Sequence, residues 1–464
     1  MQSSADNSAE VFTPSIIVIF GITGDLAQRK LLPALYRLFK DDLLDPQTVI
    51  LGITRRDVSA TQLLEQVELC VNEIDQVCDP IVLQKVHGAL RMHQMSQTDP
   101  AEYRELYELL NSIEAEQGVC MNRLYYLSIP PQMFGPIVRN LGEQGLNESC
   151  QHGVAATRLL VEKPFGYDLG SARELIAETA EWFSEEQVFR IDHYLAKDAV
   201  QDILAFRASD PAVEQLWNSD HIEHITITAY EKIDIEGRTT FYEAVGALRD
   251  FIQSHLLQVA AVATMDLPAS SESSAVHAAR LALLTGIQPV SAEQIAGTAV
   301  RGQYQGYREA VGVPDSITET FARITIAIDH PRWQDTKLTL QTGKAMAEKR
   351  TDVRVKFRGS TSELVFDIQN DSGVSLIDPH QAPEAIAALQ PLIEGFNKQH
   401  SNTSSTHPDA YERVLLDAIC GDHNLFTTGD EVIAAWQVVE GIVKAWGNSG
   451  EGLVRYPKGS RDVA

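Results

Sequence analysis

Short apolar runs alternate with longer helical patterns over the first 190 residues of the chain. The runs are rich in β-branched residues and have the length of buried strands, and they lie at residues 15–20, 49–54, 124–128, 158–161 and 187–191. Leu31, Leu35, Leu38 and Phe39 form a helical stripe between the first two runs. Strands that alternate with helices predict a Rossmann-like α/β domain over residues 1–191, with a doubly wound, mostly parallel sheet.

The pattern changes at about residue 220, where apolar and polar residues begin to alternate. The alternation is clearest at residues 222–230, 320–327, 337–340, 352–357 and 363–368. Several of these segments follow one another without a helix between them, as in antiparallel sheets with one exposed face. We therefore expect a second, α+β domain over residues 192–464, built around a large, mainly antiparallel sheet. A chain of 464 residues is long enough for two such domains.

The charge of the chain limits its partners. The formal net charge is −26 at pH 7, and 44% of the residues are hydrophobic, as is usual for soluble globular proteins. So acidic a protein repels nucleic acid and anionic membranes, and we expect neither as a partner. An anionic small substrate would have to be held by a local cluster of cations.

The cysteines and the start of the chain bear on its compartment. Cys70, Cys78, Cys120, Cys150 and Cys420 form no C-x-x-C pair and have no histidine at zinc-ligand spacing, so we expect free thiols and no metal site. Residues 1–10 lack the basic and apolar segments of a signal peptide, and no later stretch reaches about 18 uninterrupted apolar residues. Both observations favour a cytoplasmic protein.

A dense group of polar side chains follows the fifth apolar run, in the sequence Arg190-Ile-Asp-His-Tyr-Leu-Ala-Lys197. If a helix starts here, His193 and Lys197 lie four residues apart on one face and project toward a shared ligand. With the Tyr194 hydroxyl they suit a phosphate, which carries about −1.5 to −2 charges near neutral pH. The alternative is a solvated helix start with Asp192 as its N-cap.

A glycine turn follows the first predicted strand, in the sequence Gly21-Ile-Thr-Gly-Asp-Leu26. It opens a predicted helix whose N-terminal amides are suited to a pyrophosphate, although the G-x-x-G spacing is also that of ordinary turns. The second strand ends in Arg55-Arg56, where NAD-binding folds carry an acidic residue for the ribose hydroxyls. Two guanidiniums there suit a 2′-phosphate and favour NADP, unless both are solvated loop arginines.

Three further positions carry chemistry whose role the residues alone leave open. His255 lies beside the apolar stripe of a long predicted helix that begins at Gly246, and such a histidine is commonly a hydrogen-bonded core residue. Lys163 follows the fourth strand, at the edge where doubly wound folds bind ligands, or lies in a plain turn. Residues 344–350 supply three cations between two predicted strands, which is also the composition of a solvated loop.

Taken together and in this order, these segments resemble the glucose-6-phosphate dehydrogenases over residues 16 to about 459. One such motif would be weak evidence, but several in register are specific. The motifs that carry the resemblance are Gly21-Ile-Thr-Gly-Asp-Leu-Ala-Gln-Arg-Lys30, Glu162-Lys-Pro-Phe-Gly166, Arg190-Ile-Asp-His-Tyr-Leu-Ala-Lys197, Leu216-Trp-Asn218, Gly246-Ala-Leu-Arg-Asp250, His255-Leu-Leu-Gln258, Gly343-Lys-Ala345 and Asp409-Ala-Tyr-Glu-Arg-Val-Leu-Leu-Asp417.

The resemblance implies a reaction: D-glucose 6-phosphate is oxidised to 6-phospho-D-glucono-1,5-lactone with hydride transfer to NADP, as the first step of the oxidative pentose phosphate pathway. NAD remains open as a coenzyme. By position, the resemblance implies that His255 is the general base and that Asp192 orients its imidazole. It also implies a homodimer or a dimer of dimers built on the large sheet, so that residues 192–464 would serve substrate binding and dimerisation.

Two sets of binding residues also follow from the resemblance. The implied substrate contacts are Lys163, His193, Tyr194, Lys197, Glu231, Asp250, Lys344 and Lys349. The implied cofactor contacts are Gly21, Ile22, Thr23, Gly24, Asp25, Leu26, Ala27, Gln28, Lys30, Arg55 and Lys163.

The chain departs from the family's pattern at a few positions, and none of these departures removes a group that the resemblance assigns to chemistry. These positions are Gln28, Ala196, Thr239-Thr240, Glu243 and Ser254. The last residues, 456–464, lack the usual Trp-Gly-Pro ending, and we do not link them to function.

Two other functions stay open at this point. One is an oxidoreductase of the glucose–fructose oxidoreductase type, which acts on unphosphorylated sugars. Because such a sugar gives Lys197 nothing to neutralise, the phosphate motif argues against it. The other is a non-catalytic, NADP-binding regulatory relative, which would be free to lose Asp192 or His255, and both are present.

Overall fold

A computed structural model describes residues 13–75, 78–149, 155–370, 373–401 and 409–463. The chain forms two compact units. Unit 1 consists of residues 1–163, 175–191 and 408–426, and unit 2 consists of residues 164–174, 192–407 and 427–464. Each unit is built around one sheet, parallel in the first and mainly antiparallel in the second, which confirms the expected fold class.

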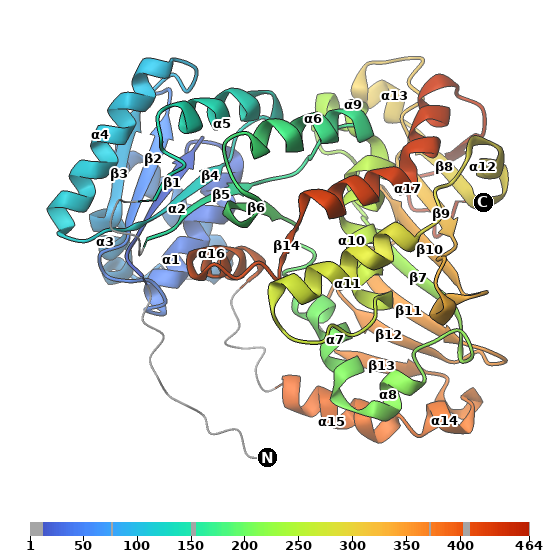
Figure 1. Ribbon diagram of the computed structural model, residues 1–464. Coiled ribbons are helices and arrows are strands. Elements are labelled where there is room, and N and C mark those ends of the chain that lie inside the picture. The colour runs from blue at the N-terminus through green and yellow to red at the C-terminus, as the bar shows by residue number, and fades with distance from the viewer. Residues whose placement is uncertain (1–12, 76–77, 150–154, 371–372, 402–408, 464) are drawn as a thin grey trace. The chain divides into compact units, whose positions relative to one another are not determined.

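Unit 1 contains a seven-stranded sheet in the order β14-β6-β5-β4-β1-β2-β3. The pairs among β1 to β6 are all parallel, and their order, 3-2-1-4-5-6, is that of dinucleotide-binding sheets. Every residue of β1, β2 and β4 is buried, as expected for continuous apolar runs with helices on both faces of the sheet (Figure 1).

The strands of this sheet are β1 (Ser15–Phe20), β2 (Val49–Thr54), β3 (Leu90–Gln94), β4 (Asn122–Leu127), β5 (Thr157–Val161), β6 (Val188–Ile191) and β14 (Phe426–Thr427). The helices of unit 1 are η1 (Ala27–Leu31), α1 (Leu32–Lys40), α2 (Ala60–Asp75), α3 (Pro80–Ala89), α4 (Pro100–Gln117), η2 (Pro131–Met133), α5 (Phe134–Glu143), η3 (Glu185–Gln187) and α16 (Ala410–Cys420). Helix α6 (Leu169–Ala180) belongs partly to each unit.

Unit 2 contains an eight-stranded sheet in the order β13-β12-β11-β7-β10-β9-β8-β15. Its neighbours are antiparallel except for the parallel pairs β7–β10 and β8–β15. The strands are β7 (Ile222–Tyr230), β8 (Ala299–Tyr304), β9 (Phe321–Ile326), β10 (Lys337–Gly343), β11 (Arg350–Phe357), β12 (Glu363–Asp367), β13 (Val374–Ile377) and β15 (Leu453–Tyr456).

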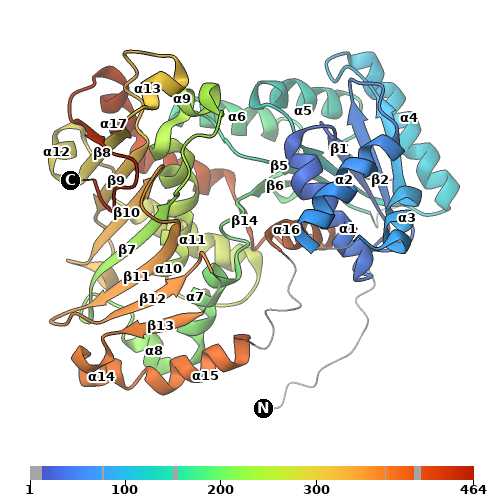
Figure 2. The same cartoon turned by 180° about the vertical axis from the view of Figure 1, so that it is seen from behind.

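Helices pack on one face of this sheet, and in the described part of unit 2 the other face carries no helix (Figures 1 and 2). The helices of unit 2 are α7 (Asp198–Ser209), α8 (Pro211–Gln215), α9 (Thr239–Ala247), η4 (Leu248–Leu256), α10 (Leu257–Thr264), α11 (Ser273–Gly286), η5 (Ala292–Gln294), α12 (Ile295–Thr298), α13 (Tyr307–Val311), η6 (Pro331–Trp333), η7 (Pro379–Gln381), α14 (Glu384–Ala387), α15 (Gln390–Ser401) and α17 (Gly429–Asn448). Ile225 and Ile227 of β7 point toward the helices, while Thr226 points to the open face, in line with the predicted alternation.

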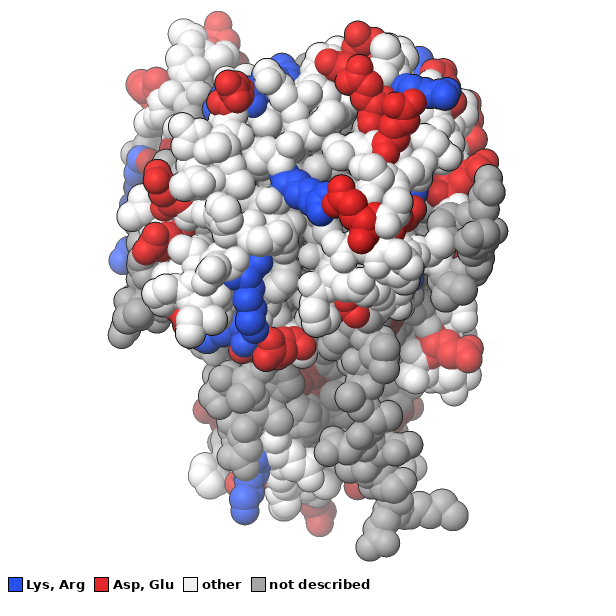
Figure 3. All heavy atoms as spheres, turned by 90° about the vertical axis from the view of Figure 1, so that its left-hand side faces the viewer, with Lys and Arg blue, Asp and Glu red and all other residues white. Residues whose placement is uncertain are grey.

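The acidic character of the chain is visible on its surface. On the face drawn in Figure 3, acidic side chains gather in several places, with separate cations between them. Among the described residues, no helix combines the length and the apolar character that crossing a membrane requires.

The expectation that all five cysteines are free thiols is wrong for Cys120, which is in a disulfide. The sequence alone could not predict this disulfide, because the spacing of cysteines along the chain does not show which of them the fold brings together. Cys78 is a buried thiol and Cys420 an exposed one. Cys150, the side chain of Cys70 and the start of the chain lie outside the described residues.

Candidate active site

The glycine turn of unit 1 has the geometry of a phosphate-binding turn. Gly21 follows β1 with a φ of +78°, and a Cβ atom there would lie 2.2 Å from the carbonyl oxygen of Ser128. Because only glycine fits, the backbone of the turn remains uncovered by a side chain at this point. Gly24 N–H donates to the Gly21 carbonyl at 2.8 Å, and a helix begins at Asp25. The residues present therefore fit a pyrophosphate held by a helix N-terminus.

Arg55 and Lys163 follow strands at the same edge of the parallel sheet. Phe20 of β1 pairs with Ile53 of β2, so the glycine turn and Arg55 both leave the sheet at its carboxyl edge. Arg55 and its neighbour Arg56 are exposed. Lys163 is half-buried beyond β5, two strands from β1 in the sheet. This edge is where open α/β sheets bind their ligands.

Asp192 and His255, 63 residues apart along the chain, form a buried pair in unit 2. The Nδ1 atom of His255 lies 2.6 Å from Oδ1 of Asp192, and their side chains are 1% and 5% exposed. Burial alone would raise the pKa of Asp192, but the adjacent His255 ring outweighs it and holds that pKa well below its usual range. Asp192 is therefore a carboxylate, and its bond fixes which ring nitrogen of His255 faces away from it.

The segment after Asp192 is a turn, so the expectation of a helix that places His193 and Lys197 on one face is wrong. The Tyr194 N–H donates to Oδ1 of Asp192 at 2.9 Å, and α7 begins only at Asp198. Aspartate side chains that accept from the backbone two residues on compete with helix formation. Asp192 is not the N-cap of that helix either, because the N-cap is Lys197.

Aromatic rings surround the His255 imidazole. The Tyr194 ring stacks on it with a centroid distance of 4.5 Å and an interplanar angle of 19°. The rings of His193 and Phe251 meet it edge-on, at 4.4 and 5.8 Å. Lys197 Nζ lies 4.8 Å from the centroid of the Tyr194 ring, so the turn brings the three predicted phosphate ligands together around the predicted base.

Lys344 and Glu231 lie near the same cluster. They form an ion pair, and Lys344 Nζ is 5.5 and 5.7 Å from the ring centroids of Tyr242 and Phe251. Phe251 therefore contacts both the His255 ring and Lys344. The sequence did not predict these contacts, because an aromatic residue in a helix is usually part of the hydrophobic core. Lys349 is exposed farther along the same loop, and its role stays a prediction.

The Tyr194 phenol lies near both the His255 ring and the Glu231 carboxylate. Burial raises its pKa well above the usual value, and its hydroxyl bonds the side chain of Thr351 on β11. The carboxylates of Glu231, Asp192 and Asp250 raise that pKa further, which shows that all three lie near the phenol. Asp250 therefore lies near the Tyr194 phenol, and the substrate contact that the resemblance implies for it stays a prediction.

Helix η4, which carries Asp250 and His255, is a π-helix rather than the α-helix that its apolar spacing predicts. Its hydrogen bonds join residues five apart, so Asp250 and His255 lie one turn apart on one face. The Ser254 hydroxyl donates to the Asp250 carbonyl at 2.7 Å within that turn. Single-turn π segments occur often at functional sites, and this one spans nine residues.

The start of η4 is fixed by Glu319, in the segment that precedes β9. Gly246 has a φ of +69°, and a Cβ atom there would lie 2.5 Å from Oε1 of Glu319. The Glu319 carboxylate accepts from Leu248 N–H at 2.9 Å, and its carbonyl accepts from Ala247 N–H at 3.0 Å. Burial raises the pKa of Glu319. Nothing in the sequence predicted the contact between Glu319 and the start of η4.

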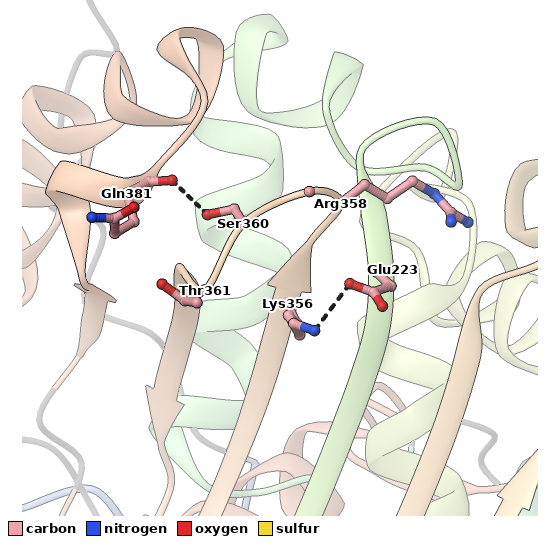
Figure 4. A pocket seen from close by; sticks show the side chains of 7 residues that line it. Glu223, Lys356, Arg358, Ser360, Thr361 and Gln381 are labelled. Atoms are coloured by element: carbon pink, nitrogen blue, oxygen red, sulfur yellow. Dashed lines mark hydrogen bonds and ion pairs between the residues drawn. The ribbon is translucent and has the colours of Figure 1, made fainter.

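A separate surface pocket lies beside the turn between β11 and β12 (Figure 4). Lys356 there pairs with Glu223 at 3.0 Å, and Arg358 donates to the carbonyls of Ser219 and Asp335. Both cations of this pocket therefore have protein partners.

The parallel sheet with its glycine turn and the Asp192–His255 pair of unit 2 together define a class of protein. It is a pyridine-nucleotide-dependent dehydrogenase, with one unit that binds a dinucleotide and a second unit that carries an acid–base pair. Matches to protein-family models confirm this class and identify the family. Residues 18–202 match "Glucose-6-phosphate dehydrogenase, NAD binding domain", and residues 204–464 match "Glucose-6-phosphate dehydrogenase, C-terminal domain". The chain belongs to the glucose-6-phosphate dehydrogenase family.

Individual relatives agree. The chain is 35% identical to a glucose-6-phosphate 1-dehydrogenase of Chlamydia muridarum, over 93% of this chain and 90% of that protein. It is 32% identical to one of Bacillus subtilis, over 96% and 94% of the two chains. A solved glucose-6-phosphate dehydrogenase in complex with its substrate glucose-6-phosphate is similar with a TM-score of 0.85 at 28% identity, covering 97% of this chain and 96% of that one. The enzyme from Mycobacterium avium gives 0.77 at 31%, covering 96% and 95%.

Proposed function

We propose that the protein oxidises D-glucose 6-phosphate at carbon 1, giving 6-phospho-D-glucono-1,5-lactone, with NADP as the hydride acceptor. The observation that carries the proposal is the buried Asp192–His255 pair, 2.6 Å apart, in contact with the turn that bears His193, Tyr194 and Lys197. The solved relative named with glucose-6-phosphate as its substrate supports the choice of sugar.

The dyad supplies general base catalysis. Asp192 keeps the Nδ1 proton of His255 in its hydrogen bond, so Nε2 is the nitrogen that takes the proton of the carbon-1 hydroxyl. As that proton leaves, the hydride on carbon 1 departs with its electron pair and the carbon–oxygen bond becomes a carbonyl. When bound, the nicotinamide ring supplies the acceptor for this hydride. The ionised Asp192 offsets the positive charge that His255 gains.

The cations bind the phosphate ester at a distance from the reacting carbon. Lys197, His193 and Lys344 offset a dianion that a chain of net charge −26 would otherwise repel. Holding the phosphate orients the sugar, and positioning of this kind supplies about 7–11 kcal/mol of a barrier in favourable cases. Glu231 pairs with Lys344 and keeps that ammonium in place while no substrate is bound.

NADP is the proposed coenzyme because of the two arginines at the end of β2. In this position of the sheet, an acidic residue would bind the ribose hydroxyls of NAD, whereas Arg55 and Arg56 suit the 2′-phosphate of NADP. The glycine turn with Gly21 and Gly24 would hold the pyrophosphate, and Lys163 would contact both cofactor and substrate.

The domain, assembly and compartment assignments are also part of the proposal. Residues 1–191 would bind the dinucleotide, and residues 192–464 would bind the substrate and form a homodimer through the open face of the large sheet. That face carries polar residues such as Thr339, which bonds Thr325, and Arg354, which pairs with Glu363. Light scattering should then give twice the chain mass of 51.3 kDa, or four times that mass for a dimer of dimers. The cytoplasm is the proposed compartment: the exposed thiol of Cys420 favours it, the disulfide of Cys120 is unusual there, and cell fractionation tests the assignment.

The substitution His255→Asn tests the proposed base. Asparagine keeps a polar side chain of smaller size but accepts no proton at neutral pH, so we expect kcat to fall by about 10²–10⁴-fold. His87→Asn is the control, since His87 is an exposed histidine on α3 of unit 1. Near-wild-type turnover of the His255 variant would refute the proposed base.

A further inference from the structure

The C-terminal segment, residues 456–463, runs alongside the loop that carries Lys344. We call residues 344–347 the Lys344 loop. Gly459 N–H donates to the carbonyl of Ala345 at 2.8 Å, and Ala347 N–H donates to the carbonyl of Ser460 at 2.9 Å. Met346 and Ser460 form a parallel bridge. The end of the chain therefore adds strand-like bonds to a loop that no named strand includes.

Tyr456 makes the most direct contact. Its hydroxyl donates to the carbonyl oxygen of Lys344 itself, at 2.8 Å, and it also lies 2.8 Å from the Thr320 hydroxyl. Thr320 in turn accepts the Lys344 N–H at its carbonyl, at 2.8 Å. Tyr456 is 3% exposed, and burial raises the pKa of its phenol, so it remains a neutral hydrogen-bond donor. Both backbone groups of Lys344 are thus held by this pair.

The loop needs such support because of its conformation. Ala345 has a φ of +52°, a left-handed backbone that is strained for an alanine. On one side, Ala345 N–H donates to the Ile233 carbonyl and Met346 N–H to the Glu231 carbonyl. On the other side lies the C-terminal segment. Ala345, Met346, Tyr456 and Val463 are buried in one hydrophobic cluster, which ties the segment to the loop.

We propose that the C-terminal segment is a positioning element for the substrate-binding Lys344, acting through the hydrogen bond from Tyr456. The ammonium of Lys344 projects between Glu231 and the rings of Tyr242 and Phe251, and its place there depends on where its backbone is held. The proposal rests on the proposed role of Lys344 as a contact to glucose 6-phosphate.

The substitution Tyr456→Phe tests it, because it removes one hydroxyl and keeps the buried ring. A lost hydrogen bond to this backbone should raise the KM for glucose 6-phosphate by about three- to tenfold. We expect kcat and the KM for NADP to change by less than about twofold, since the tail acts only through Lys344. A purely structural role would instead lower the melting temperature without a selective effect on one KM.

Tyr304→Phe is the matched control. Tyr304 is a buried tyrosine of the same cluster, and its hydroxyl makes no side-chain bond to the Lys344 loop or to Thr320 within the described residues. This variant should leave both KM values unchanged. An unchanged KM for glucose 6-phosphate in Tyr456→Phe, or an equal rise in Tyr304→Phe, would overturn the proposal.

A double-mutant cycle separates this inference from the proposed function. Lys344→Met should raise the KM for glucose 6-phosphate at least about tenfold, and adding Tyr456→Phe should raise it no further. Additive effects would overturn the positioning role while leaving Lys344 as a substrate contact. An unchanged KM in Lys344→Met would refute Lys344 as that contact, and the positioning role would fail with it.

Discussion

Replacing Asp192 with asparagine isolates what its charge does for His255, the proposed catalytic base. The amide is nearly the same size as the carboxylate, so the packing against His255 remains, but the negative charge is lost. The pair is almost completely buried, and the two atoms lie 2.6 Å apart. Under these conditions the charge-assisted bond is strong and little screened by water.

The magnitude follows from that geometry. Removing one partner of a buried ionic pair costs about 3–5 kcal/mol. If about 3–4 kcal/mol of this falls on the step in which His255 becomes charged, kcat decreases by about 10²–10³-fold, at about 1.4 kcal/mol for each factor of ten. The KM for glucose 6-phosphate should change by less than about threefold, because Lys197 and His193 remain in place.

The pH dependence gives a second readout. Because the pKa of Asp192 is lowered on folding, its stabilising contribution is present above the unfolded value, about 3.9, and is lost only as pH falls through the lower folded value. Asp192 therefore does not titrate between pH 5 and pH 9, and the acidic limb of the kcat profile belongs to another group. In Asp192→Asn we expect that limb to move to lower pH, since the amide stabilises a protonated imidazole less.

The measurement is the steady-state rate of the purified variant from pH 5 to pH 9. Asp315→Asn is the control, since it removes the same charge from an exposed position. A kcat of Asp192→Asn within about threefold of wild type across this range would show that the buried carboxylate does not assist the base.

Three further predictions address other parts of the protein. Lys197→Met should raise the KM for glucose 6-phosphate by about 10–100-fold because it removes a charged phosphate contact, whereas the exposed Lys232→Met should not; equal effects in steady-state assays would contradict the phosphate site. Arg55→Ala should raise the KM for NADP far more than that for NAD, and equal changes would show that Arg55 does not contact the 2′-phosphate. Burial and the charge of Asp422 raise the pKa of Asp417 to about 7. The contribution of Asp417 to the stability of the fold is therefore most favourable below its pKa in the unfolded chain, about 3.9, and is lost as pH rises toward 7. Asp417→Asn should therefore raise the melting temperature at pH 8 but not at pH 4, and a similar shift at both pH values would refute the argument.

Much of the fold could be predicted because its strands are strongly patterned. Residues 15–20 and 49–54 are continuous buried runs, and the structure has β1 and β2 at these same residues. Strand β3 was missed because its sequence, Leu-Arg-Met-His-Gln, has no β-branched residue and lies at the edge of its sheet. Strand β15 was missed because a four-residue segment near the chain end has too little pattern to register.

The site was predictable only where motifs identify it. The pairing of Asp192 with His255 joins residues from distant parts of unit 2, and no periodicity relates them, so the resemblance was needed to connect them. The π-helix could not be predicted, because its apolar residues also fit an α-helical stripe. The hydrogen bond from Tyr456 to the Lys344 carbonyl could not be predicted, since a bond to a backbone carbonyl leaves no mark in residue spacing.

The most direct test of the account is the initial rate of reduced-nicotinamide formation by the purified wild-type protein. Four reactions suffice: glucose 6-phosphate or glucose, each with NADP or NAD. We predict saturable activity with glucose 6-phosphate and NADP, and no measurable rate when glucose replaces the phosphate ester. Equal rates with glucose, or no rate with either coenzyme, would contradict a dehydrogenase that binds the phosphate of its substrate through Lys197, His193 and Lys344.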